Sequence, residues 1–222
     1  MHVEEYRRKY RESVIPPTYD GNRNVRNNVA CCAGMIGGSV LMLEQWSWGT
    51  ALAFAGGALA FNGLEYSFHR WVSHEKRPAL AASYRRHAGE HHGFFDAENM
   101  SSPSLADYHV TIMPTATIAI YFIAFLLILG LPIGLIAGRS AGAAFSLAIA
   151  VSLFQLDILH HYYHVGSDTR LARLLGRFAY FRYLKALHAR HHAKGSMAHQ
   201  GFNITHPLFD WILGTLGARH GS

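Results

Sequence analysis

Histidines are the residues of this chain whose number and spacing point most directly to chemistry. Sixteen of the 222 residues are histidine, and ten of them form four groups with the patterns HxxxxH, HxxxHH, HxxxH and HxxHH: His69 and His74; His87, His91 and His92; His160 and His164; His188, His191 and His192. Imidazole nitrogen binds zinc, copper, iron and nickel. A lone histidine is more often a core residue, but ten in spaced groups are difficult to explain in that way. Because ten ligands exceed what one ion can use, we predict two metal ions.

Helical spacing predicts which of these histidines act together. Residues three or four apart share one face of a helix, so the second, third and fourth groups can each direct imidazoles at a common point. His69 and His74 are five residues apart, which is about 140° around an α-helix. We therefore expect this pair either to serve different metals or to lie on the two sides of a helix end.

Carboxylates near the histidines are the expected hydrogen-bond partners of the metal ligands. Ligand histidines usually donate their second ring nitrogen to a carboxylate or carbonyl oxygen. Glu65 lies one turn before His69, and Asp157 lies three residues before His160, each at the end of an apolar stretch where an unpaired carboxylate is costly. We expect both in this supporting role, together with His161, which points about 100° away from its neighbour. The remaining histidines are left outside the ligand set: His2, His109, His199, His206 and His220.

The elements that must position these groups are apolar. Half of the residues are hydrophobic and 15% are charged, below the roughly 25% of soluble domains. Four apolar stretches cover residues 29–43, 46–64, 112–137 and 141–156. A membrane span needs about 20 apolar residues, and the third stretch has 26 residues without a charge. Pro114 and Pro132 predict a turn before this helix and a kink or end within it.

The lysines and arginines predict how these stretches are oriented. Nineteen of the twenty lie before the first stretch, between the second and third, or after the fourth, and only Arg139 lies on the other side. The positive-inside rule then places both termini and the middle loop in the cytosol. The net charge of +6 suits nucleic acid or an anionic membrane surface, and the long apolar stretches favour the membrane.

These observations together predict an all-α, multi-pass integral membrane protein. The four apolar stretches predict four membrane helices, with the histidine groups on their cytosolic side. Residues 1–28 are expected to form a cytosolic amino-terminal arm, and residues 29–222 a single domain.

Several motifs resemble those of one known superfamily. They are EYSFHRW at 65–71, HAGEHH at 87–92, DILH at 157–160, YYH at 162–164, LKALHARHH at 184–192, GFNIT at 201–205 and FDWILGT at 209–215. With these motifs the chain resembles the fatty acid hydroxylase and sterol desaturase superfamily of membrane di-metal oxygenases. The second histidine group, HxxxHH, departs from the HxxHH typical of fatty acid 2-hydroxylases.

The resemblance implies an all-α fold, in which an integral membrane four-helix bundle carries a helical cytosolic cap with the histidine-rich di-metal site. It also implies a reaction class. It implies oxidation of an unactivated C–H bond in a fatty-acyl or other lipid, with O2 and external electrons, and the two metals are then iron. Sterol-type or carotenoid-type hydroxylation and desaturation stay open. We expect a separate electron donor, either a haem b-type carrier or a ferredoxin with its reductase, because the sequence has no room for the haem-binding domain of some members.

Two other classes of protein are less consistent with the sequence. A membrane metal transporter would favour ionisable residues near the middle of the bilayer, but the third stretch has none. A hydrolytic zinc enzyme needs an open position for water, and ten imidazoles leave few. Zinc in a purified sample would not contradict iron, because iron lies below zinc in the affinity order. The substrate, the oxidised carbon and the electron donor are not specified by the sequence.

Overall fold

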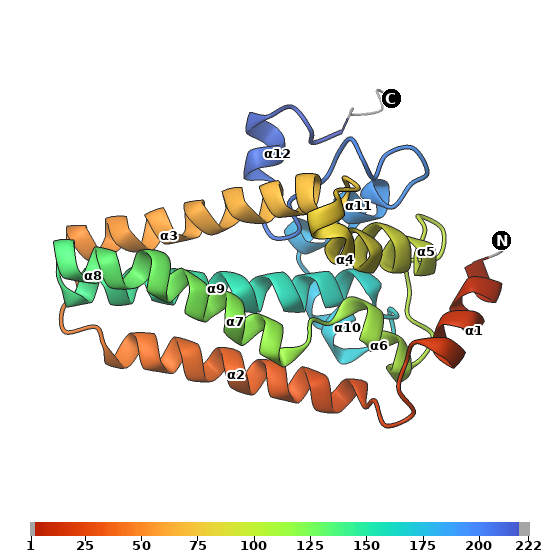
Figure 1. Cartoon of the computed structure of the whole chain (residues 1–222), viewed down its shortest axis with the longest axis horizontal. Helices are drawn as coiled ribbons and strands as arrows, with labels where there is room; N and C mark the ends of the chain where they lie inside the picture. The colour runs from red at the N-terminus through yellow and green to blue at the C-terminus, as the bar shows by residue number, and fades with distance from the viewer. Residues whose placement is uncertain (1–2, 218–222) are drawn as a thin grey trace. The chain divides into compact units, whose positions relative to one another are not determined.

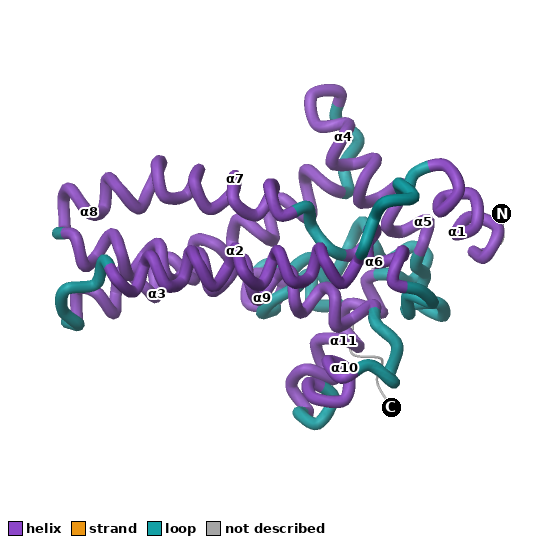
Figure 2. The backbone as a smooth tube through the Cα atoms, turned by 90° about the horizontal axis from the view of Figure 1, so that it is seen from below, coloured by secondary structure: helices purple, strands orange, loops and turns teal. Residues whose placement is uncertain are grey.

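The computed structural model describes residues 3–217, and these residues form helices and loops without strands (Figures 1 and 2). This confirms the all-helical prediction. The chain divides into two compact units. We call residues 22–63 and 113–158 the apolar unit, and residues 1–21, 64–112 and 159–222 the histidine unit. Met1, His2 and 218–222, which include His220, lie outside the described residues.

The apolar unit is built from the four predicted stretches. Its elements are α2 (Gly21–Leu41), most of α3 (Trp48–Ser67), α7 (Thr115–Phe125), the π-helix η5 (Leu126–Gly130), α8 (Leu131–Ala137) and the first part of α9 (Arg139–His164). Its core includes Phe61 from α3, Ile118 from α7 and Leu153 from α9. Pro114 precedes α7 and Pro132 lies at the start of α8, which follows the π-helical turn. The two prolines therefore lie where the sequence predicted a break.

Small residues let α8 approach α9 closely. A Cβ atom on Gly142 would lie 2.6 Å from the carbonyl oxygen of Gly130 and 2.7 Å from the Cα of Gly134. Such close backbone contact is typical of helix pairs in membranes, where small residues form the interface. Two helical segments, Leu105–Ala137 and Arg139–His164, are long and apolar enough to cross a membrane.

Polar contacts hold neighbouring segments of the apolar unit together at each of its two ends. At one end, the Ser140 hydroxyl accepts from the backbone N–H of Glu44 at 3.1 Å, and Arg139 pairs with Glu44 at 2.9 Å. At the other end, Asp157 accepts from the Asn28 side chain at 2.8 Å. The contacts of Glu44 therefore bring together the two predicted loops that contain only one positive charge between them, that of Arg139.

The histidine unit consists of shorter helices. They are α1 (Val3–Ser13), the π-helix η1 (Phe68–Ser73), η2 (Pro78–Leu80), α4 (Ala81–Tyr84), the π-helix η3 (Arg85–His91), α5 (His92–Phe94), η4 (Leu105–Asp107), α6 (Tyr108–Thr111), α10 (Arg170–Leu175), α11 (Ala179–His191) and α12 (Leu208–Ile212), with the ends of α3 and α9. Tyr10 of α1 packs in a core with Phe94, Phe95 and Val110. The predicted amino-terminal arm thus contains a helix that belongs to this unit.

Candidate metal centre

All ten predicted histidines lie in the histidine unit and form two adjacent groups. The first cluster contains His69, His74, His87, His92 and His191, and the second contains His91, His160, His164 and His188; within each group the nitrogen atoms lie within 4.8 Å of one another. The Nε2 atom of His192 lies 3.1 Å from those of His91 and His188, so we count His192 with the second cluster. The sequence therefore identified residues that the fold brings together, and their role as metal ligands stays a prediction.

The first histidine pair lies on the two sides of a helix end. His69 lies within the π-helix η1, and His74 is the residue that follows its last residue. Their Nε2 atoms are 3.2 Å apart. One of the two expectations for this pair is thus correct, and the other, that the pair serves different metals, does not match the shared cluster.

The second and fourth groups each divide between the clusters, which corrects the expectation that each converges on one point. His87 and His91 have stacked rings 5.1 Å apart, as do His188 and His191 at 5.8 Å. Each pair therefore shares a helix face, as predicted. However, residues three or four apart are also separated by about 4.5–6 Å along a helix axis, so one face supplies both clusters. His160 and His164 do lie in one cluster.

Backbone carbonyl groups fix the orientation of six of these rings. The Nδ1–carbonyl distances are 2.5 Å for His69 and Phe202, 3.4 Å for His91 and Val110, 3.1 Å for His160 and Thr111, 3.0 Å for His164 and Met100, 2.8 Å for His191 and Gln200, and 3.0 Å for His192 and Phe95. A carbonyl oxygen only accepts, so each Nδ1 must donate its proton. In a neutral imidazole the Nε2 atom then has a lone pair and no proton.

The resulting lone pairs face one another, which is the arrangement that a cation requires. The Nε2 atom of His91 lies 3.1 Å from that of His192 and 3.2 Å from that of His160, and all three rings donate through Nδ1. Two such nitrogens cannot hydrogen-bond to each other. Metal–nitrogen bonds of about 2.0–2.1 Å would place neighbouring ligand nitrogens roughly 2.9–3.4 Å apart. The donor set therefore fits a metal ion in each cluster.

Burial keeps these rings neutral. Desolvation lowers the pKa of His69 to about 4 and that of His192 to about 3. For His74, burial and the neighbouring His69 and His192 lower the pKa to about 2. Metal binding needs the neutral imidazole, so the protein provides it at physiological pH. The Nδ1 atom of His92 is buried with no hydrogen-bond partner among the described residues, and this ring lacks the orienting contact.

The predicted carboxylate Glu65 supports the site through the backbone. Its carboxyl oxygens accept from the N–H groups of Ile204 and Thr205 at 2.7 and 2.8 Å and from the Thr205 hydroxyl at 2.6 Å. Asp210 accepts from the N–H groups of Phe202 and Asn203 at 2.9 and 2.7 Å. Together they hold the segment whose Phe202 carbonyl orients His69. Asp210 was not predicted as a site residue from the sequence, although it lies within the FDWILGT motif.

Asp157 and His161 differ from their predicted role. The Nδ1 atom of His160 contacts the Thr111 carbonyl, whereas Asp157 lies in the apolar unit and accepts from Asn28 and from the backbone N–H of Met113. A carbonyl therefore replaces the expected carboxylate. His161 is buried against the ring of Tyr108, 4.4 Å between ring centroids, and is in neither cluster.

The other described histidines lie outside the clusters, as expected. His109 lies beside Tyr10, His206 contacts the Tyr180 hydroxyl at 2.7 Å, and His199 is exposed. None of the three belongs to a group of candidate ligands among residues 3–217.

Comparison with known proteins identifies a family for this chain. The family model described as fatty acid hydroxylase matches residues 54–215, which is well over half of the chain. The matched region contains all ten clustered histidines, Glu65 and Asp210, and begins after α1 and α2. No curated protein and no solved structure matches the chain.

Proposed function

The chain belongs to the fatty acid hydroxylase family, within the sterol desaturase and fatty acid hydroxylase superfamily, and from this we propose that it is a membrane-bound di-iron enzyme that hydroxylates a lipid. The observation that carries the proposal is the convergence of Nε2 atoms from ten buried or half-buried histidines, in two adjacent clusters. The ligands would be the first cluster for one iron and the second cluster for the other.

Iron is the metal that suits the proposed reaction. Strong C–H bonds resist acid–base chemistry, and bound iron with O2 and external electrons supplies the one-electron chemistry that side chains lack. The side chains of this protein hold the Nδ1 protons on carbonyl oxygens, keep the imidazoles neutral and exclude water by burial. They must also hold the reacting carbon in place, since a misplacement of about 1 Å can cost roughly a hundredfold in rate.

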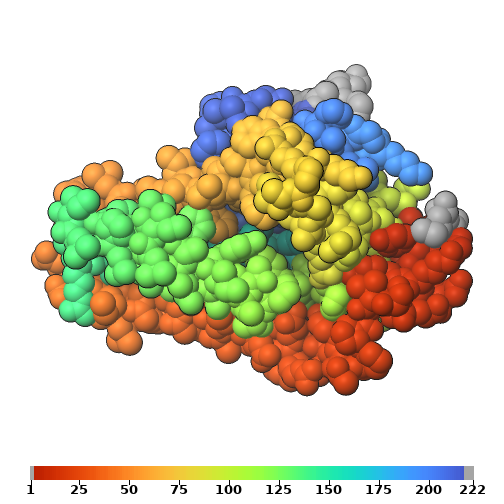
Figure 3. Space-filling view, viewed as in Figure 1, coloured from red at the N-terminus to blue at the C-terminus, as the bar shows by residue number. Residues whose placement is uncertain are grey.

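The exposed side chains of the apolar unit support a membrane location. Leu135 and Ile136 of α8 are each 87% exposed, and Ile128 of η5 is 70% exposed. The atoms of α7, η5 and α8 form an outer face of this unit (green in Figure 3). Large apolar faces of this kind indicate contact with lipid or with another protein. We propose lipid, with four membrane-spanning segments and both termini in the cytosol, because the positive charges are distributed in that way.

The lipid substrate and the electron source follow from this placement. A fatty-acyl chain or other lipid would enter from the bilayer, and helix α9, which begins in the apolar unit, continues to carry His160 and His164. The clusters contain no group that supplies electrons, so we propose a separate donor protein, a haem b-type carrier or a ferredoxin with its reductase.

Product analysis under labelled oxygen tests the proposal. Membranes from cells that express the chain would be supplied with reductant and 18O2, and total lipids would be analysed by mass spectrometry. We expect a hydroxylated lipid that carries the label and depends on the reductant. The His188→Ala variant should abolish the product, whereas His199→Ala, a substitution of an exposed histidine, should retain it. Label that comes from water, or turnover that continues without oxygen, would refute the proposal.

A further inference from the structure

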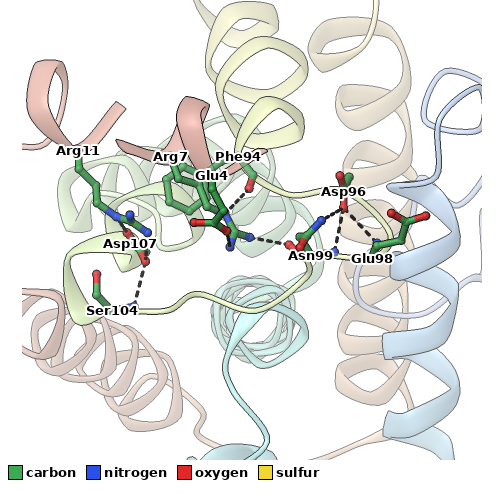
Figure 4. Close-up of polar contacts among 9 residues, drawn as sticks. All are labelled: Glu4, Arg7, Arg11, Phe94, Asp96, Glu98, Asn99, Ser104 and Asp107. Atoms are coloured by element: carbon green, nitrogen blue, oxygen red, sulfur yellow. Dashed lines mark hydrogen bonds and ion pairs between the residues drawn. The ribbon is translucent and has the colours of Figure 1, made fainter. Parts of the chain in front are cut away.

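The amino-terminal helix α1 carries a buried arginine with an unusual set of partners. Arg7 is only 3% exposed. Its Nε atom donates to the Phe94 carbonyl at 2.9 Å, and its Nη2 atom donates to the Asn99 carbonyl at 2.6 Å (Figure 4). Its third contact is Glu4, at 3.0 Å. Removing an arginine from water is costly unless its donors are satisfied, and these three contacts offset that cost.

The two carbonyl groups that Arg7 holds are each next to a carbonyl that orients a clustered histidine. Phe95, which follows Phe94, accepts from the Nδ1 atom of His192 at 3.0 Å. Met100, which follows Asn99, accepts from the Nδ1 atom of His164 at 3.0 Å. Both histidines belong to the second cluster. The guanidinium group therefore fixes the backbone immediately beside two ligand-orienting groups.

The same stretch of chain is braced at two further points. The Asp96 carboxylate accepts from the backbone N–H groups of Glu98 and Asn99, at 3.1 and 2.8 Å. Arg11 of α1 makes two hydrogen bonds to the fully buried Asp107, at 2.7 and 3.0 Å, and Asp107 also accepts from the N–H of Ser104 (Figure 4). Helix α1 thus holds the segment between residues 94 and 107 near both of its ends.

The first cluster depends on other contacts. His69 and His191 are oriented by the carbonyl groups of Phe202 and Gln200. Glu65 holds the segment just after Phe202. An effect of Arg7 should therefore be selective for the second cluster.

We propose that α1 positions the second metal site, with Arg7 as the positioning residue that acts through the Phe95 and Met100 carbonyls on His192 and His164. The inference rests on the proposed metal centre. Helix α1 lies outside the residues that match the family model, 54–215, so family membership does not assign this role.

Release of iron from the purified protein tests the proposal. The full chain, in detergent and without oxygen, would be loaded with iron(II) and mixed with a ferrous chelator. Arg7→Lys retains the charge but loses the planar fork that reaches two carbonyl groups. Changes behind the ligands typically cost about 10–100-fold in metal affinity, so we expect one of the two ions to leave about tenfold faster. Arg8→Lys is the matched control, because Arg8 lies on the exposed face of α1.

Combined variants identify which site is affected. His188→Ala removes a second-cluster ligand, and adding Arg7→Lys to this variant should then cause no further change in the rate of iron release. His74→Ala removes a first-cluster ligand, and Arg7→Lys should then accelerate loss of the remaining ion. This dependence on background distinguishes positioning from general destabilisation, and circular dichroism should show unchanged helix content for Arg7→Lys.

Three outcomes would overturn the inference. If Arg7→Lys accelerates the release of both ions equally, Arg7 is merely structural. If it behaves like Arg8→Lys while the unaltered protein holds two ions, the inference fails and the proposed metal centre remains. If the unaltered protein cannot hold two ions, the proposed function and the inference fail together.

Discussion

Replacing Glu65 with glutamine exchanges one oxygen of a buried carboxyl group for an NH2 group. One oxygen of Glu65 accepts from the backbone N–H groups of Ile204 and Thr205, and the amide oxygen of glutamine can retain those bonds. The other oxygen accepts from the Thr205 hydroxyl at 2.6 Å and from the Asn203 amide at 3.3 Å. The hydroxyl can rotate and accept from the new NH2 group. The Asn203 NH2 group cannot accept, so two donors would face each other.

The size of the effect follows from that one lost hydrogen bond. Depriving a buried donor of its acceptor costs about 1–3 kcal/mol. For a protein of this size, 1 kcal/mol corresponds to about 2–4 °C in the melting temperature, so we expect Glu65→Gln to melt about 2–12 °C lower. Because the Phe202 carbonyl orients His69, the ion of the first cluster should also bind more weakly, and the ion of the second cluster should be unchanged.

Thermal unfolding of the detergent-solubilised protein and chelator release of iron(II) measure the two effects. Glu98→Gln is the control, because it makes the same chemical change on an exposed side chain of the same unit. Equal melting temperatures for the two variants, or faster release from the second cluster instead of the first, would refute the argument that Glu65 holds the 202–205 segment.

Three further predictions concern pH, topology and helix packing. Burial lowers the pKa of His69 from 6.5 to about 4, so the unfolded chain binds a proton that the folded metal-free protein excludes. The stability of the metal-free protein should therefore be full above pH 6.5 and fall between pH 6.5 and 4, and a melting temperature independent of pH in this range would contradict this. In a variant without native cysteines, Gln45→Cys should react with an impermeant thiol reagent from outside the cell and Lys194→Cys should not; the reverse pattern would exclude the proposed orientation. Gly142→Ala places a Cβ atom 2.6 Å from a backbone oxygen and should destabilise the protein by about 1–3 kcal/mol. Gly37→Ala, which meets nothing within 4 Å in α2, should stabilise it by about 0.5–1 kcal/mol, and equal unfolding of the two variants would contradict the packing argument.

The sequence predicted the histidine clusters because residue type and spacing are written directly in the motifs. What it could not predict is which histidine joins which cluster, because helical spacing shows which rings share a face and not which of two neighbouring sites each ring reaches. Residues 68–73 and 85–91 are π-helices, whose i→i+5 hydrogen bonds change the angle between successive side chains. The HxxxxH spacing of His69 and His74 predicted a helix end between them, and His74 does follow the last residue of the π-helix η1.

The groups that orient the histidines were less predictable for a different reason. Backbone carbonyl oxygens have no signature in a sequence, and most of them come from residues far along the chain from the rings they hold, as Phe202 does for His69. Glu65 and Asp157 were chosen because each lies near a histidine in the sequence. Both form buried hydrogen bonds, but their partners lie more than forty residues away, at Ile204 for Glu65 and Met113 for Asp157.

Two doublets of adjacent histidines, His91–His92 and His191–His192, link the two clusters. Adjacent residues on a helix differ by about 100°, so a doublet can direct one ring to each of two neighbouring ions. His92 of one doublet meets His191 of the other in the first cluster, and His91 meets His192 in the second, with Nε2 distances of 3.1 Å in both pairs. The rings of His92 and His192 also stack across the two clusters at 4.2 Å. Each doublet therefore carries one candidate ligand for each site, so a shift of η3 or α11 by one residue would disturb both clusters together.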